Sequence, residues 1–103
     1  MSDNNLSLDF DRDVMHSYEE AKVLGYNPGF YLIMFKKYGG VGTAKKLLST
    51  VDFMQDGFTK LWELKRLDLS IEAIVIKDEY STLFVDKEKE IANKRLDSLG
   101  YIK

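Results

Sequence analysis

Residues 56–77 hold the only tryptophan of the chain, Trp62, and a dense set of aliphatic side chains. Apolar residues recur there at helical spacing on both sides of a polar run. Asp56 is placed to cap a first helix and Ser70 a second one, because both side chains accept hydrogen bonds from free backbone amides. The stretch predicts two helices that meet at a tight corner, with the other helices packed around it.

A strand is the alternative for two segments of this chain. Residues 73–76 are mostly β-branched, and residues 30–35 form a six-residue apolar run of a kind also found in buried strands. An isolated strand leaves its backbone groups unpaired, and no second strand of comparable quality is evident for 73–76. Pro28 before the apolar run and Lys36-Lys37 at its end are typical of helix termini. Helices are therefore predicted for both segments.

The rest of the chain divides into short amphipathic segments separated by turn residues. A helix starting at Asp9 or Asp11 should stop at Gly25, and Asn27 should cap the next. Further helices are expected after the glycine turn and at the end of the chain, where Asp86 is the predicted cap and Gly100 the stop. The expected connections are residues 39–43, 49–55 and 80–84. The sequence predicts an all-α, compact single domain of five to six short helices in residues 9–103, after a flexible leader in residues 1–8.

Composition narrows the class of protein. A chain of 103 residues with 45% hydrophobic and 13% aromatic content is typical of one globular domain. The sequence contains no cysteine, which excludes disulfides and thiolate metal sites and fits a reducing compartment. The chain starts with polar residues, without a secretory leader, and its longest apolar run is too short to span a membrane. A cytoplasmic location and no membrane partner are expected.

The glycine turn and its neighbouring lysines are a candidate site. Gly39-Gly-Val-Gly-Thr43 matches neither a P-loop nor a dinucleotide fingerprint, and is interpreted as a turn between two helices. Four lysines flank this turn and are candidate contacts for a partner or for nucleic acid: Lys36, Lys37, Lys45 and Lys46. The outline resembles a helix–turn–helix, but its second helix offers no Arg, Asn or Gln for base contacts. A formal net charge of -2 also argues against nucleic acid as the main partner.

Polar residues of the corner have two interpretations. Arg66, Asp68 and Glu72 either hold a ligand or form an internal lock, in which Arg66 forks onto a carboxylate and fixes the angle between two helices. We favour the lock, since charges among apolar residues require partners. Trp62 is expected in the core, with a half-exposed partner contact as the alternative.

Groups suited to catalysis are sparse in the sequence. His16 is the only histidine, and we place it at the edge of the first helix. The acidic residues are spread along the chain and are typical of solvated helix faces. No catalytic residue, cofactor or metal is therefore predicted, and a small hydrolase or nuclease ranks last among the functions considered.

Several short motifs together resemble a small bacterial helical domain family of unsettled function. The motifs are Gly39-Gly-x-x-x-Ala44-Lys-x-Leu-Leu48, Gly57-Phe-x-x-Leu-Trp62, Arg66-Leu-Asp-Leu-Ser-x-Glu-Ala73, Leu83-Phe84 and Leu99-Gly-Tyr101. The family occurs as a stand-alone protein and as a tail on larger proteins, some of them nuclease-like. The resemblance extends from about Phe10 to Tyr101 and implies an accessory module in bacterial defence or mobile-element systems, without catalytic residues.

The hypothesis from the sequence is a non-catalytic helical adaptor that binds another, unidentified protein. The aromatic content is high for so small a core, and the sequence lacks catalytic constellations. The alternative is a small nucleic-acid-binding module that uses the lysines around Gly39-Gly40.

Overall fold

The computed structural model describes residues 2–26, 29–49 and 56–101, with side chains for residues 5–26, 32–49 and 59–101. The predictions that concern Asn27, Pro28 and most of the 49–55 connection lie outside these residues. The described chain is all-α, as predicted, and contains no strand. Its helices are α1 (Ser2–Val23), α2 (Gly29–Leu48), α3 (Asp56–Glu63), the 3-10 helix η1 (Leu67–Leu69), α4 (Ile71–Val75), the 3-10 helix η2 (Asp78–Leu83) and α5 (Asp86–Ser98).

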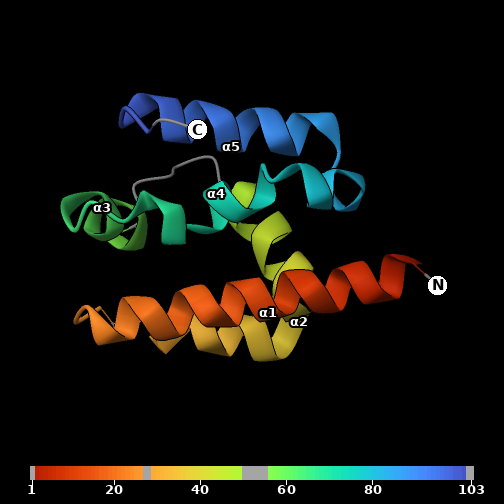
Figure 1. Cartoon of the computed structure of the whole chain (residues 1–103), viewed down its shortest axis with the longest axis horizontal. Helices are drawn as coiled ribbons and strands as arrows, with labels where there is room; N and C mark the ends of the chain where they lie inside the picture. Colours follow the sequence, from red (N-terminus) through yellow and green to blue (C-terminus); the bar gives the residue numbers. More distant parts are fainter. Residues whose placement is uncertain (1, 27–28, 50–55, 102–103) are drawn as a thin grey trace.

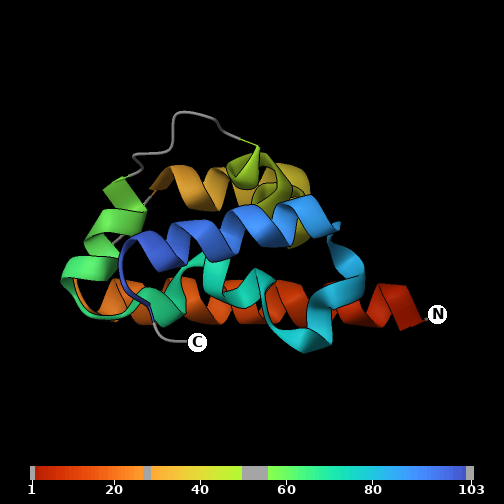
Figure 2. The same ribbon diagram turned by 90° about the horizontal axis from the view of Figure 1, so that it is seen from above.

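The short helix α4 lies at the centre of the fold. It contacts α1, α2 and α5, and Figure 1 shows it between the long α1 and α2 on one side and α5 on the other. All of its residues, Ile71–Val75, are buried. In the view from above, α5 runs between α1 and α2 (Figure 2). The second helix of the predicted corner thus lies in the middle of the domain, whereas α3 lies at one end of it (Figure 1), and 73–76 is not a strand.

Two hydrophobic clusters form the core around α4. The first joins α1, α2, α4, η2 and α5, with Phe10 packed edge-on against Tyr80 at a ring-centroid distance of 5.1 Å. The second cluster joins residues of α1, α3, η1, α4 and α5. It includes Leu61, Leu67 and Leu96. Burial of these apolar side chains holds the helices together.

The helix α1 is longer than predicted. It begins at Ser2, so the segment expected as a leader forms its first turns, and Leu6 packs against the first cluster. Its end agrees with the prediction: Gly25 has φ +100°, and the Tyr26 amide donates to the Ala21 carbonyl at 2.9 Å. This is the Schellman arrangement, in which a left-handed residue lets the chain turn back onto the last helical turn.

The helix α2 contains the predicted glycine turn as a kink. Gly39 has φ 76° and ψ 176°, so two helical halves meet there. The Gly40 amide, the first of the second half, donates to the Asp11 carboxylate of α1 at 2.8 Å. A side chain from another helix therefore caps the second half of α2.

Caps define the ends of α4 and α5. Ser70 caps α4 as predicted: its hydroxyl accepts from the Ala73 amide at 3.2 Å. The predicted cap of α5 was wrong by one position. Val85 is the N-cap, Asp86 is the first helical residue, and the Glu88 carboxylate accepts from the Val85 amide at 2.9 Å. A glutamate three positions into a helix can reach back to the N-cap amide, which a sequence pattern centred on Asp86 did not reveal.

Candidate functional site

The polar residues of the predicted lock separate into two ion pairs. Arg66 forks onto Asp68 through two hydrogen bonds of 3.0 and 3.1 Å. It also lies 3.6 Å from Glu20 of α1. The hydrogen bond to Asp68 is the main cause of the raised pKa of Arg66. This partly exposed fork links α1 to the corner and leaves Glu72 out.

Glu72 belongs to a second, buried pair. Its carboxylate lies 3.1 Å from the Arg95 guanidinium of α5, and the two side chains are 4% and 11% exposed. Arg95 also donates to the carbonyls of Leu47 and Leu48, at 3.0 and 3.5 Å. One arginine thus joins α4, α5 and the end of α2. Sequence reasoning missed this contact because its partners are far apart in the chain.

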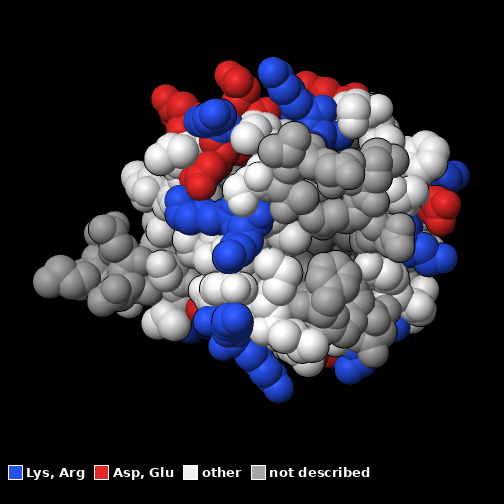
Figure 3. Space-filling view, turned by 180° about the vertical axis from the view of Figure 1, so that it is seen from behind, with Lys and Arg blue, Asp and Glu red and all other residues white. Residues whose placement is uncertain are grey.

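The predicted lysine cluster is only partly assembled. Lys37 and Lys46 come from opposite sides of the kink, and their ammonium groups lie 5.3 and 4.9 Å from the Tyr38 ring centroid. Lys45 points elsewhere, forming an ion pair with Glu88 of α5 at 2.9 Å. Lys36 is exposed. On the face drawn in Figure 3, basic side chains form separate groups with uncharged residues between them.

The structure also describes Trp62 and His16, two further residues considered in the sequence. Trp62 is 47% exposed, so its predicted place in the core was wrong. Leu61 takes the inward position on α3 instead, with an exposed fraction of 7%. His16 is exposed on α1, as predicted, and lies 3.1 Å from Glu20.

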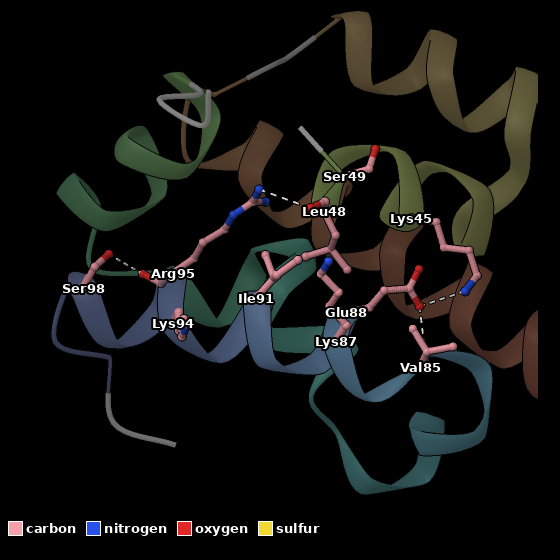
Figure 4. A pocket seen from close by; sticks show the side chains of 10 residues that line it. All are labelled: Lys45, Leu48, Ser49, Val85, Lys87, Glu88, Ile91, Lys94, Arg95 and Ser98. Atoms are coloured by element: carbon pink, nitrogen blue, oxygen red, sulfur yellow. Dashed lines mark hydrogen bonds and ion pairs between the residues drawn. The ribbon is translucent and has the colours of Figure 1, made fainter. Parts of the chain in front are cut away.

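A groove between α2 and α5 is the candidate binding site. It has a volume of about 790 Å³ and is open to solvent. Leu48, Val85 and Ile91 are its apolar lining residues, and Leu48 among them is only 2% exposed. Figure 4 shows Leu48 and Ile91 side by side between the two helices. The other lining residues are polar or charged: Lys45, Ser49, Lys87, Glu88, Lys94, Arg95 and Ser98.

The two walls of the groove are fastened to each other. The Lys45–Glu88 pair crosses from α2 to α5, and Arg95 reaches from α5 to the carbonyls that end α2 (Figure 4). Such cross-links hold a binding surface in one shape before a ligand arrives, which reduces the entropy lost on binding.

The remaining charge of the groove is positive. Lys45 and Arg95 are neutralised by Glu88 and Glu72. Lys87 and Lys94 are exposed, and no ion pair joins either of them to another residue among those that the structure describes. They stand seven positions apart on α5 with Ile91 between them, which places all three on one helix face. The sequence contained this signal in the spacing of Lys87, Ile91 and Lys94, which sequence reasoning did not single out.

The acidic residues of α5 other than Glu88 lie outside the groove lining. Asp86 and Glu90 are exposed, and Figure 3 shows acidic and basic side chains interspersed along the edge formed by α5. By helical geometry, Glu90 falls on the flank of the stripe and outside the groove lining. The groove face thus carries an excess of positive charge, and the flank beside it carries negative charge.

The buried Tyr80 hydroxyl is paired within the chain, whereas the buried Thr43 hydroxyl has no hydrogen-bond partner among the described residues. The Tyr80 hydroxyl donates to Asp13 at 2.5 Å, and burial raises the pKa of this tyrosine. No group of three or more His, Cys, Asp or Glu residues suited to a metal ion exists among the described residues. Nor does any helix in the described ranges have the length and apolar character needed to cross a membrane.

Comparisons of the chain with protein-family models, with curated proteins and with solved structures give no match.

Proposed function

We propose that this chain is a non-catalytic protein-interaction module whose binding site is the α2–α5 groove. The occupant is a segment of another protein that carries acidic side chains around an apolar anchor. One observation carries the proposal: Lys87 and Lys94 flank Ile91 on the open side of a groove whose walls are already cross-linked.

The acidic character of the partner follows from the charges. Two of the four basic groups in the groove already have carboxylate partners, so the positive charge of Lys87 and Lys94 remains for a ligand. Complementary charge steers an encounter and fixes its register. The energy of binding then comes mainly from the apolar anchor, since an exposed ion pair contributes only about 0.2–1 kcal/mol.

The apolar anchor has a defined place. Val85 is 60% exposed, and Ile91 is only partly buried against the first hydrophobic cluster. A large apolar side chain laid against Val85 and Ile91 would cover this surface and remove it from water. The non-catalytic part of the proposal is supported by the pairing of Arg66, Glu72 and Asp13, whose polar groups each have a partner within the chain.

Affinity capture from the host, with matched charge reversals, tests this function. Lys87→Glu/Lys94→Glu reverses the groove charge, and Lys36→Glu/Lys60→Glu makes the same change of charge at exposed positions outside it. The expected result is a protein captured by the wild type and by the second variant, and lost with the first. The purified partner should then bind the wild type directly. Equal capture by all forms, or equal loss from both variants, contradicts the groove as the site.

A second candidate function is supported by the Lys37–Tyr38–Lys46 cluster. A partly exposed ring between two ammonium groups has the composition of a contact for single-stranded nucleic acid, where bases stack on aromatic rings and cations neutralise phosphates. We rank it second because only two of the four flanking lysines converge. A mobility-shift assay with a single-stranded oligonucleotide should show binding that weakens with salt and is lost in Lys37→Ala/Lys46→Ala. Binding without salt dependence, or none, removes this candidate.

The resemblance noted in the sequence adds a biological setting to the first proposal. It is consistent with an accessory module that acts alone or as the tail of a larger bacterial protein. Defence and mobile-element systems are accordingly the setting in which the capture experiment should be carried out.

A further inference from the structure

The walls of the groove restrict the conformation of its occupant. Both walls are helices, α2 and α5, whose backbone groups bond within the helix or, at the end of α2, accept from Arg95. The described residues offer no strand edge onto which an extended segment could add. An extended segment with a buried anchor would therefore leave backbone N–H and C=O groups unpaired, which is unfavourable. A helical segment pairs these groups itself.

The spacing of the basic residues points in the same direction. Lys87, Ile91, Lys94 and Ser98 follow one another at intervals of four, three and four along α5, and all line the groove. Seven residues of helix advance by about 10 Å. A second helix laid alongside α5 repeats this spacing when it carries two carboxylates seven positions apart and an apolar residue between them.

Resting on the function proposed above, we infer that the occupant is an amphipathic acidic helix of the partner protein, lying along α5. Its apolar residue contacts Ile91, and its two acidic residues face Lys87 and Lys94. In helix-in-groove complexes of this kind, side chains at helical intervals make the contacts with the groove. The cross-linked walls mean that the groove accepts the helix without reorganising.

Defined peptides test this inference without knowledge of the natural partner. Because the chain has no cysteine, Ser98→Cys provides a unique attachment point for an environment-sensitive fluorophore in the groove, and Glu19→Cys provides a control point on α1. The first probe is an alanine-based helix of about 20 residues, long enough to be helical alone. It carries one leucine flanked by two glutamates seven positions apart. The second probe has a central proline, and the third has lysines in place of the glutamates.

The expected result is a saturable signal from the helical acidic peptide at the Ser98→Cys label, with none at the Glu19→Cys label. The proline peptide should bind on the order of 100-fold more weakly, since proline disfavours a helix interior. Lys87→Glu/Lys94→Glu should weaken binding of the acidic peptide about tenfold and should favour the lysine peptide instead.

Different outcomes overturn different statements. Equal binding of the helical and proline peptides, or no binding of the helical peptide at the groove label, overturns the helical occupant. The proposed function is judged separately, by whether capture of the natural partner depends on the groove charges. A partner captured through the groove that binds as an extended segment would retain the function and refute the helix.

Discussion

The carboxylate of Asp11 accepts a hydrogen bond of 2.8 Å from the backbone amide of Gly40, and this contact joins the middle of α1 to the kink of α2. The positive end of a helix is thereby occupied by an anion from within the chain. Asp11 thus supplies the anion at the glycine turn.

Substitution at this contact should destabilise the fold. A Cβ added at Gly40 would collide with the Asp11 carboxylate and lie 3.2 Å from the Phe10 ring. We expect Gly40→Ala to lower the free energy of unfolding by about 1–3 kcal/mol, the usual effect of overpacking. Asp11→Ala should lower it by about 0.5–2 kcal/mol through loss of the cap. Urea unfolding measures both changes, and Asp9→Ala, on the same helix in an exposed pair, should be close to neutral.

The buried Arg95–Glu72 pair should be sensitive to removal of one partner. Arg95→Met leaves the Glu72 carboxylate buried without its cation, and should lower the free energy of unfolding by about 3–5 kcal/mol. Adding Glu72→Leu should recover part of this loss. Recovery should be incomplete because the carbonyls of Leu47 and Leu48 still lack their donor. Denaturant unfolding of the single and double variants checks the prediction, and a double variant less stable than Arg95→Met would contradict it.

Glu72 should also make stability depend on pH. Burial raises the pKa of its carboxyl above the ordinary value of 4.5, outweighing the opposing effects of a backbone hydrogen bond and of Arg95. Between the unfolded and folded pKa values the folded state binds more protons, so this group's contribution to the free energy of unfolding falls as pH rises through that window. A glutamine at position 72 does not ionise, so the Glu72→Gln variant lacks this pH-dependent contribution to the free energy of unfolding. The wild type should therefore lose stability relative to Glu72→Gln in a pH series that begins below 4.5; a relative gain would show the opposite sign.

The helix ends provide a mirrored pair of substitutions. Lys65 ends α3 with φ 60°, the only non-glycine residue with positive φ among the described residues, whereas Gly100 ends α5 with φ 75°. A left-handed conformation costs a side chain roughly 1–2 kcal/mol. Lys65→Gly should therefore raise the melting temperature, and Gly100→Lys should lower it. Thermal unfolding followed by circular dichroism gives both values. A destabilised Lys65→Gly would mean that the lysine side chain itself contributes at this end.

Local signals in the sequence were sufficient for the helical class and for several helix ends. Ser70 and Gly100 carry their roles in their chemistry, so the α4 cap and the end of α5 were predictable. Trp62 was placed wrongly because Leu61 and Trp62 are neighbours in the chain. The helical spacing alone allows either of them to face the core. Only the tertiary packing shows that Leu61 points inward.

The groove could not be predicted from the sequence, for a different reason. Its charge depends on which lysines are neutralised, and the Lys45–Glu88 and Arg95–Glu72 contacts join residues 43 and 23 positions apart. Periodicity identifies neighbours only within a helix. The helical spacing of Lys87, Ile91 and Lys94 is present in the sequence. Their exposure could not be predicted from it.

The position of α4 has a consequence for how the domain unfolds. With five residues, this helix is far too short to persist alone in water, because helix nucleation is unfavourable. It exists only while α1, α2 and α5 surround it. Its amide protons should therefore exchange with solvent only when the whole domain opens, and the chain should resist division into smaller autonomous fragments.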